Sequence, residues 1–125
     1  MRLVGFHHFA LQVIDLERMC AFYRETLGLP ELTRHFRPDG SLRSVWLTVP
    51  ESGFIALEAV DAAEVKSTSK NFVLAFKIRR EERARVAEEL AQVGIQIDRE
   101  TRWTVFFRDP EGNRLGLSHH PSDPL

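Results

Sequence analysis

Apolar and polar residues alternate along residues 7–13 and again along residues 72–78. Phe9, Leu11 and Val13 fill every second position of the first run, and the second run repeats the pattern about 65 residues later. Alternation with a period of two is typical of a strand that buries one face. We therefore predict a strand in each place.

A helical pattern follows each of these strands. After the first, Asp15 offers an N-cap, apolar residues recur at helical spacing, and Gly28 ends the helix. After the second, a charged helix begins near residue 80, carries Val86 and Leu90 on one face, and ends at Gly94. The chain is therefore predicted to contain two copies of a strand–helix unit.

Three more strand-like runs follow each predicted helix. They cover residues 31–37, 42–49 and 54–60 in the first half, and residues 95–98, 104–108 and 113–119 in the second. The turns between them are rich in Pro, Asp, Ser and Gly, which suit the backbone conformations of tight turns. Each half is thus predicted to have the order strand–helix–strand–strand–strand.

The two copies predict an α+β fold of two βαβββ modules in one domain. Module 1 covers about residues 3–60, a polar linker about 61–70, and module 2 about 71–120. A half of roughly 60 residues buries too little surface to be stable alone. We therefore expect the two sheets to complete one another, within the chain or across a dimer.

Composition and charge restrict the partners. The 125 residues are 43% hydrophobic, and 17 Lys and Arg nearly balance 18 Asp and Glu, so the net charge of −1 gives no general attraction to nucleic acid or anionic lipid. No apolar run approaches the ~20 residues that span a bilayer, and the N-terminus leads into a strand rather than a cleavable signal. We expect a cytoplasmic protein with no nucleic acid or membrane partner, in which the single cysteine, Cys20, packs in the core.

Three stretches are similar to a known family: residues 8–16 (HFALQVIDL), 22–28 (FYRETLG) and 107–113 (FRDPEGN). Together with the paired modules they resemble the vicinal oxygen chelate superfamily, which contains glyoxalase I, extradiol dioxygenases, fosfomycin-resistance proteins, methylmalonyl-CoA epimerase and bleomycin-binding resistance proteins. The resemblance covers nearly the whole chain and implies the glyoxalase/bleomycin resistance/dioxygenase fold, a cupped mixed sheet. It leaves the activity open, because this fold hosts isomerases, oxygenases, transferases and pure binders.

The resemblance also implies where a metal would bind. In metal-using members each module contributes an inward residue from its first strand and another from its last, usually His and Glu, which suit a divalent cation. Alternate residues of a strand face the same side of the sheet, which we call their parity. By this parity His8 faces the concave side of the cupped sheet, the cup, where it matches the first ligand. Val73 and Gly116 stand at the two positions of the second module, and neither side chain can bind a metal. His119 and His120 follow, but we expect both to be solvated near the C-terminus.

The remaining ligand position falls in residues 54–60, where two registers are open. One places Glu58 at the ligand position, and the other, by analogy with the last strand of module 2, places Ala56 there. Both residues face the cup, but only the first register puts Glu58 level with His8. Two protein ligands make a poor metal site, since zinc sites ordinarily use three or four. We therefore expect a metal-free protein, with Zn, Ni, Mn or Fe held by His8 and Glu58 as the alternative.

The residues that parity turns into the cup combine aromatic walls with a few polar groups, as small-molecule sites do. They are His8, Gln12, Ser44, Trp46, Thr48, Glu58, Thr104, Phe106 and Arg108. The competing interpretation is that Trp46 and Phe106 are core or dimer contacts and that Arg108 holds a turn. The charged run at 79–85 is predicted to be a solvated helix face with an ion pair between Glu81 and Arg85.

Three functions are consistent with these residues, so whether the protein is an enzyme stays open. The first is a homodimeric, metal-free binder of a small molecule, like the bleomycin-resistance proteins that the chain resembles. The second is a metal-dependent lyase, isomerase or dioxygenase that uses His8 and Glu58. The third, a metal-free enzyme with Glu58 or His8 as general base, has the least support because no set of oxyanion donors accompanies it.

Overall fold

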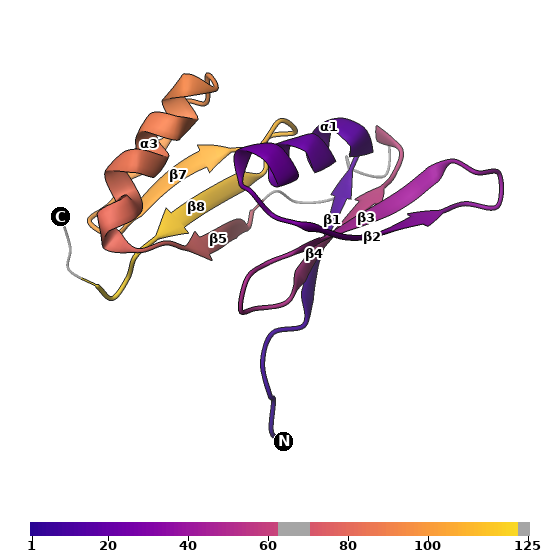
Figure 1. The fold of residues 1–125 in the computed structure, drawn as a ribbon, viewed down its shortest axis with the longest axis horizontal. Coiled ribbons are helices and arrows are strands. Elements are labelled where there is room, and N and C mark those ends of the chain that lie inside the picture. The colour runs from indigo at the N-terminus through magenta and orange to yellow at the C-terminus, as the bar shows by residue number, and fades with distance from the viewer. Residues whose placement is uncertain (63–70, 123–125) are drawn as a thin grey trace. The chain divides into compact units, whose positions relative to one another are not determined.

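The computed structural model describes residues 1–62 and 71–122 and divides the chain into two compact units, Met1–Thr68 and Ser69–Leu125. Each unit has a four-stranded mixed sheet and a helix (Figure 1). The predicted α+β fold and the repeated order of strand, helix and three strands are confirmed. Apart from its first two positions, the predicted linker at 61–70 lies outside the described residues.

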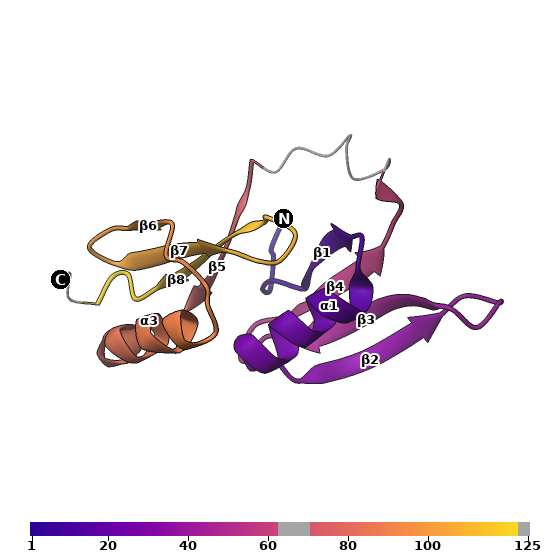
Figure 2. The ribbon, with the colours of Figure 1, turned by 90° about the horizontal axis from the view of Figure 1, so that it is seen from above.

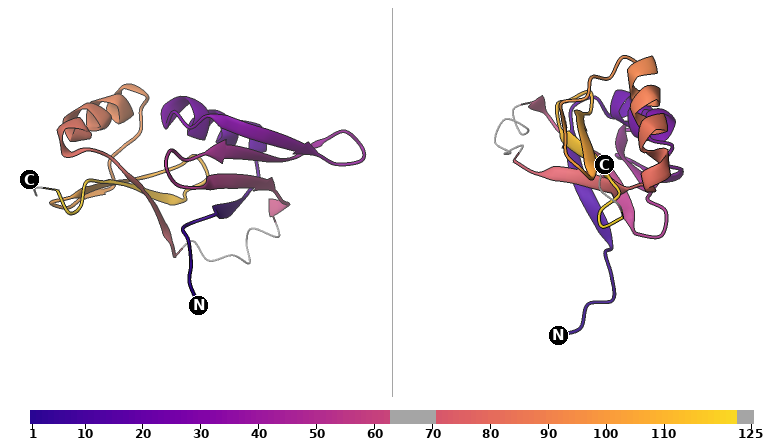
Figure 3. Two further views of the ribbon diagram at one scale, coloured as in Figure 1. Left: turned by 60° about the horizontal axis from the view of Figure 1, so that its bottom comes forward. Right: turned by 90° about the vertical axis from the view of Figure 1, so that its left-hand side faces the viewer.

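The first unit contains β1 (His8–Val13), α1 (Leu16–Ala21), a π-helical turn η1 (Phe22–Thr26), β2 (Glu31–Phe36), β3 (Leu42–Thr48) and β4 (Phe54–Ala59). Its strand order is β1-β4-β3-β2, with β1 parallel to β4, and β2 is the edge strand of the antiparallel β2–β3 hairpin (Figure 3). Asp15 is the N-cap of α1, as predicted, because its Oδ1 accepts a hydrogen bond from the Arg18 amide at 3.1 Å.

The second unit contains β5 (Val73–Lys77), a 3-10 turn η2 (Arg80–Glu82), α3 (Arg83–Gln92), β6 (Arg99–Glu100), β7 (Thr104–Arg108) and β8 (Arg114–Ser118). Its strand order is β5-β8-β7-β6, with β5 parallel to β8. Figure 2 shows α3 along one face of this sheet, and no described helix of the unit lies on the other face.

The prediction of a strand at residues 95–98 is wrong. Gly94 adopts a φ of +77°, and the Ile95 amide donates to the Leu90 carbonyl at 2.9 Å, so these residues cap α3 instead of joining the sheet. Pairing begins where the Asp98 amide donates to the Phe106 carbonyl at 2.7 Å, and the strand itself is Arg99–Glu100.

The core of the first unit lies between its sheet and α1. Leu11 and Val13 are buried beneath the helix, and α1 contributes Met19 and Cys20. Burial removes water from the Cys20 thiol and raises its pKa above the ordinary value, so the thiol stays protonated near neutral pH. Cys20 is therefore a packing residue, as predicted.

Arg83 and His119 correct two sequence predictions, because both side chains are buried rather than solvated. Arg83 Nη1 lies 3.1 Å from His119 Nε2, and Arg83 Nη2 donates to the Thr101 carbonyl at 2.8 Å. His119 is buried because pairing continues past β8, where its amide donates to the Trp103 carbonyl. A guanidinium can only donate, so His119 Nε2 accepts and its proton lies on Nδ1, 3.2 Å from the Ser122 carbonyl oxygen. We call this group the Arg83–His119 pair.

The rest of the charged run at 79–85 is exposed, as predicted, except for the partly buried Glu82. The ion pair differs from the predicted one. Arg85 pairs with Glu82 at 3.0 Å and with Glu89 at 3.4 Å, not with Glu81. His120 is exposed, as predicted. No described helix is both long and apolar enough to cross a membrane.

Candidate functional site

The face of the first sheet that points away from α1 carries the predicted site residues of that unit. His8 and Gln12 are exposed on β1, while Leu11 between them is buried. In the β3–β4 pairing, three partners share this face: Ser44 lies opposite Glu58, Trp46 opposite Ala56, and Thr48 opposite Phe54. The structure therefore brings the first-unit candidates onto one surface.

Five rings form a continuous row on this surface, which we call the aromatic row: His7, His8, Phe54, Trp46 and His35. His8 and Phe54 are stacked with ring centroids 5.0 Å apart, and Phe54 and Trp46 are stacked at 4.4 Å. The backbone explains the stacking, because β1 and β4 pair His8 with Phe54. Ala56, opposite Trp46, is small enough to leave the indole free to lean toward Phe54.

Hydrogen bonds fix the imidazoles at both ends of the aromatic row. His7 Nδ1 lies 2.8 Å from His8 Nδ1, so one ring donates a hydrogen bond to the other. At the other end His35 Nδ1 lies 3.1 Å from the hydroxyl of Ser44, which is buried. The row is thus an aromatic surface with oriented polar groups at its two ends.

The strand register separates Glu58 from His8. His8 pairs with Phe54, whereas Glu58 pairs with Gln12, four residues and about 13 Å further along the strand. In the second unit Gly116 pairs with Ala75 as Ala56 pairs with Ala10, so Ala56 and not Glu58 corresponds to Gly116. The structure has the second of the two registers that the sequence left open.

In the second unit the ring of Phe106 covers the position of Gly116. A Cβ atom at Gly116 would lie 3.3 Å from Phe106 Cε1 and 3.2 Å from Thr104 Cγ2. The guanidinium of Arg114 lies over this ring, with its Cζ 4.5 Å from the centroid. The position that the resemblance assigns to a carboxylate ligand is therefore packed beneath an aromatic ring.

Thr104 and Arg108 have local partners. The Thr104 hydroxyl donates to Ser118 Oγ at 2.8 Å. Arg108 Nη1 donates to the Gly112 carbonyl at 3.0 Å, so this side chain does bind the turn, as the competing interpretation held. Its Nε also faces Asp98 Oδ2 at 3.4 Å, which ties β7 to the segment before β6.

His7, His35 and Phe54 belong to the aromatic row but were not among the predicted site residues. Parity assigned His7 to the opposite face, whereas β1 begins only at His8 and leaves His7 free of that alternation. The parity of His35 could not be read from the sequence, because the β2–β3 pairing shifts register beside it. Phe54 had a usable signal, since it shares the parity of Glu58.

No group of three His, Cys, Asp or Glu side chains among the described residues is placed to share a metal ion. His8 is the one predicted ligand that keeps its expected position on β1, and the structure gives it a histidine and a phenylalanine as neighbours. The chemistry that this surface offers is stacking and hydrogen bonding.

Comparisons with known proteins agree with the fold. A family model described as the Glyoxalase/Bleomycin resistance protein/Dioxygenase superfamily matches residues 5–117. The chain is similar to a lactoylglutathione lyase from Agrobacterium tumefaciens, with a TM-score of 0.73, 20% identity and 96% coverage of each chain.

Two further solved structures have the same fold. The fosfomycin resistance protein FosX from Listeria monocytogenes, complexed with Mn(II) and sulfate, has a TM-score of 0.77 and 20% identity, with 97% of this chain and 96% of that chain covered. A glyoxylase/bleomycin resistance protein/dioxygenase domain from Frankia sp. EAN1pec has a TM-score of 0.74 and 25% identity, with 94% and 98% covered.

Proposed function

Because this chain belongs to the glyoxalase/bleomycin resistance protein/dioxygenase superfamily, we propose that it binds a small organic molecule with a planar ring on the aromatic row of its first sheet. The stacked series of His8, Phe54 and Trp46 is the observation that carries this proposal. A planar ligand would extend a stack that the strands already hold in place, so little side-chain freedom is lost on binding.

The exposure of these rings supports a binding role over a purely structural one. Trp46 and Phe54 are only partly buried, and His8 is exposed. Gln12 and Glu58 continue the same face and offer polar groups that can orient a ligand. Small-molecule sites ordinarily combine aromatic walls with a few such groups.

Replacing Trp46 with alanine is expected to weaken ligand binding by about 10- to 100-fold, because it removes the largest ring of the row. The measurement is a screen of planar aromatic compounds in which ligand binding quenches Trp46 fluorescence. A Trp103→Phe background makes Trp46 the only indole, since the protein has two tryptophans. Affinities of the Trp46→Ala variant are then measured by calorimetry.

Trp46→Phe is the matched control, because it keeps a ring at this position and should retain most of the affinity. Ligands that bind the Trp46→Ala and Trp46→Phe variants as tightly as the parent would show that the aromatic row is not the binding surface.

We further propose that this binding needs no metal ion. Val73 and Gly116 offer no donor side chain, Phe106 covers Gly116, and Glu58 is not level with His8. Fewer than three protein ligands are ordinarily too few for a catalytic zinc site. The homodimer and the cytoplasmic location expected from the sequence stay predictions.

Thermal melts with metals test this second proposal. A cation that binds only the folded protein adds about 2.7 kcal/mol of stability at a concentration 100 times its dissociation constant. We expect Zn, Ni, Mn and Fe(II) to leave the melting temperature of the tag-free protein at its value in EDTA. A stabilisation by any of them that disappears in His8→Ala would overturn the proposal.

A further inference from the structure

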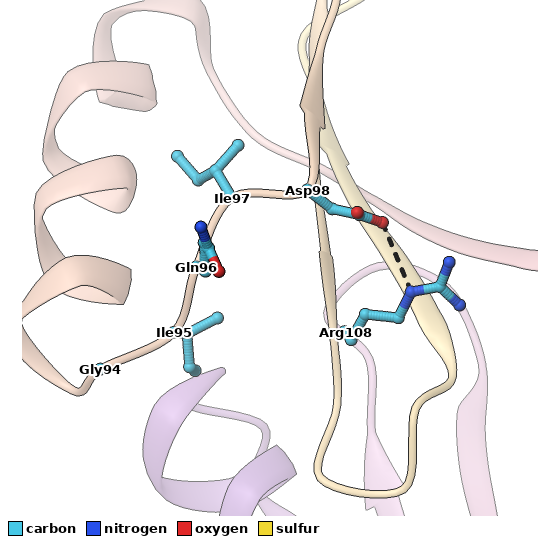
Figure 4. A pocket seen from close by; sticks show the side chains of 6 residues that line it. All are labelled: Gly94, Ile95, Gln96, Ile97, Asp98 and Arg108. Atoms are coloured by element: carbon cyan, nitrogen blue, oxygen red, sulfur yellow. Dashed lines mark ion pairs between the residues drawn. The ribbon is translucent and has the colours of Figure 1, made fainter.

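A pocket of about 460 Å³ lies in the second unit, between the end of α3 and β7, which is within the usual size of small-molecule sites (Figure 4). Its lining residues are Gly94, Ile95, Gln96, Ile97, Asp98 and Arg108. Ile95 and Ile97 give it an apolar wall, and Figure 4 shows the ion pair of Asp98 and Arg108 at its other side.

Two arginines meet beside this pocket. Arg108 and Arg114 are directly opposite each other in the β7–β8 pairing, an arrangement of like charges that is unfavourable unless an anion compensates it. Asp98 Oδ2 lies 3.4 Å from Arg108 Nε and 3.8 Å from Arg114 Nε. One carboxylate thus faces two guanidinium groups, which leaves an excess positive charge.

The same face of the sheet holds further positive charge. Arg99 lies opposite Phe106, and Lys77 lies opposite Ser118, so both share the face of Arg114. This charge is local, because the chain as a whole has a net charge of −1. It therefore favours a small anion over a polyanion such as nucleic acid.

Arg114 is the best-prepared group of this cluster. Its guanidinium lies over the ring of Phe106, and its Nε is buried with no hydrogen-bond partner among the described residues. A buried donor without an acceptor is costly. The planar guanidinium matches the oxygen spacing of a carboxylate or a phosphate.

We propose that the second unit has a separate binding site for a small organic acid. Arg114 and Arg108 bind its carboxylate or phosphate group, and Ile95 and Ile97 contact its apolar part in the pocket. Asp98 occupies the anion position in the free protein, because its carboxylate already faces both guanidinium groups. All residues of this site belong to the second unit, whereas the aromatic row belongs to the first.

Benzoate and phenyl phosphate are suitable probes, because each joins an apolar ring to one of the two anionic groups, and benzyl alcohol is the uncharged control. Each is titrated at constant ionic strength while the arginine Nε–H and backbone amide signals are followed by NMR. Saturable shifts at Arg114 Nε and at the amides of Ile95 and Ile97 are expected with one or both acids and not with benzyl alcohol. The acid that binds more tightly shows whether the site prefers a carboxylate or a phosphate.

Substitutions separate this site from other binding. Arg114→Gln is expected to weaken binding of the acid by about tenfold or more, because a charge-assisted hydrogen bond is lost. Asp98→Asn is expected to tighten it severalfold, because the competing carboxylate becomes neutral. Arg85→Gln alters an exposed arginine on α3, and it should leave the affinity read from the Arg114, Ile95 and Ile97 signals unchanged. Trp46→Ala should also leave the affinity read from these signals unchanged.

The proposal is overturned if neither acid gives saturable shifts at Arg114 Nε and at the amides of Ile95 and Ile97, if benzyl alcohol gives the same shifts, or if Arg85→Gln weakens the binding that these shifts report as much as Arg114→Gln does. Loss of these shifts in Trp46→Ala would also overturn it, because they would then report an acid that is bound on the aromatic row. Failure of the aromatic row to bind planar compounds leaves this site unaffected.

Discussion

Replacing Arg83 with methionine is expected to lower the free energy of unfolding by about 3 kcal/mol. Methionine preserves most of the length of the side chain, so the loss comes from polar groups. His119 Nε2 and the Thr101 carbonyl would both lose the donors that the Arg83–His119 pair supplies at 3.1 and 2.8 Å. Each buried acceptor left without a partner costs about 1–3 kcal/mol.

Urea unfolding followed by circular dichroism measures this loss. Arg85→Met is the control, because Arg85 makes only exposed ion pairs on the same helix and should change stability by less than about 0.5 kcal/mol. The double variant Arg83→Met/His119→Leu should recover part of the loss, because one unsatisfied acceptor is replaced by an apolar group. Equal losses in Arg83→Met and Arg85→Met would show that burial of the pair carries no energetic weight.

Replacing Gly53 with alanine is expected to destabilise the first unit by about 2 kcal/mol and to displace His7 from the aromatic row. A Cβ atom at Gly53 would overlap the carbonyl oxygen of His7, which is backbone and cannot rotate away. That oxygen accepts a hydrogen bond from the Phe54 amide at 3.2 Å, and this bond would be lost with the shift. Ligand affinity should therefore fall even though no ring is altered.

Chemical denaturation and NMR of the histidine rings measure the two effects. Ser52→Ala, in the same turn, is the control and should leave both unchanged, because the Ser52 amide makes the turn's backbone hydrogen bond. Removing residues 1–7 deletes the clashing oxygen, so in that background Gly53→Ala should cost little. If Gly53→Ala destabilised the truncated protein as much as the full chain, the clash would not be with the carbonyl oxygen of His7.

Much of the fold was predictable, because the alternation of period two is local. Leu11 and Val13 are buried and His8 and Gln12 exposed, as the sequence pattern requires. The family and the α+β fold were also predictable, because the strand, helix and turn signals recur in both halves, and both predictions are confirmed. Asp15 starts α1 and Gly94 ends α3 where capping chemistry predicts.

The errors arose where contacts between residues far apart in the sequence decide whether a side chain is buried. His119 was predicted to be solvated because it is near the C-terminus, but its amide pairs with the Trp103 carbonyl and its ring meets Arg83. Charge spacing could not indicate which arginine of the run at 79–85 turns inward. The aromatic row and the cluster at Arg114 depend on which residues of neighbouring strands pair, and alternation along one strand fixes the face of a residue but left two registers of equal parity open.

The packing of Phe106 over Gly116 limits how the chain could be converted into a metalloprotein. Val73→His and Gly116→Glu would supply two new donors, yet the new carboxylate would meet the phenyl ring where it leaves the strand. Shortening residue 106 would clear that space and at the same time take away the surface on which Arg114 rests. Recovery of metal binding would thus demand several simultaneous replacements. Each alone leaves a clash with Phe106, an Arg114 guanidinium without its ring contact, or too few metal ligands.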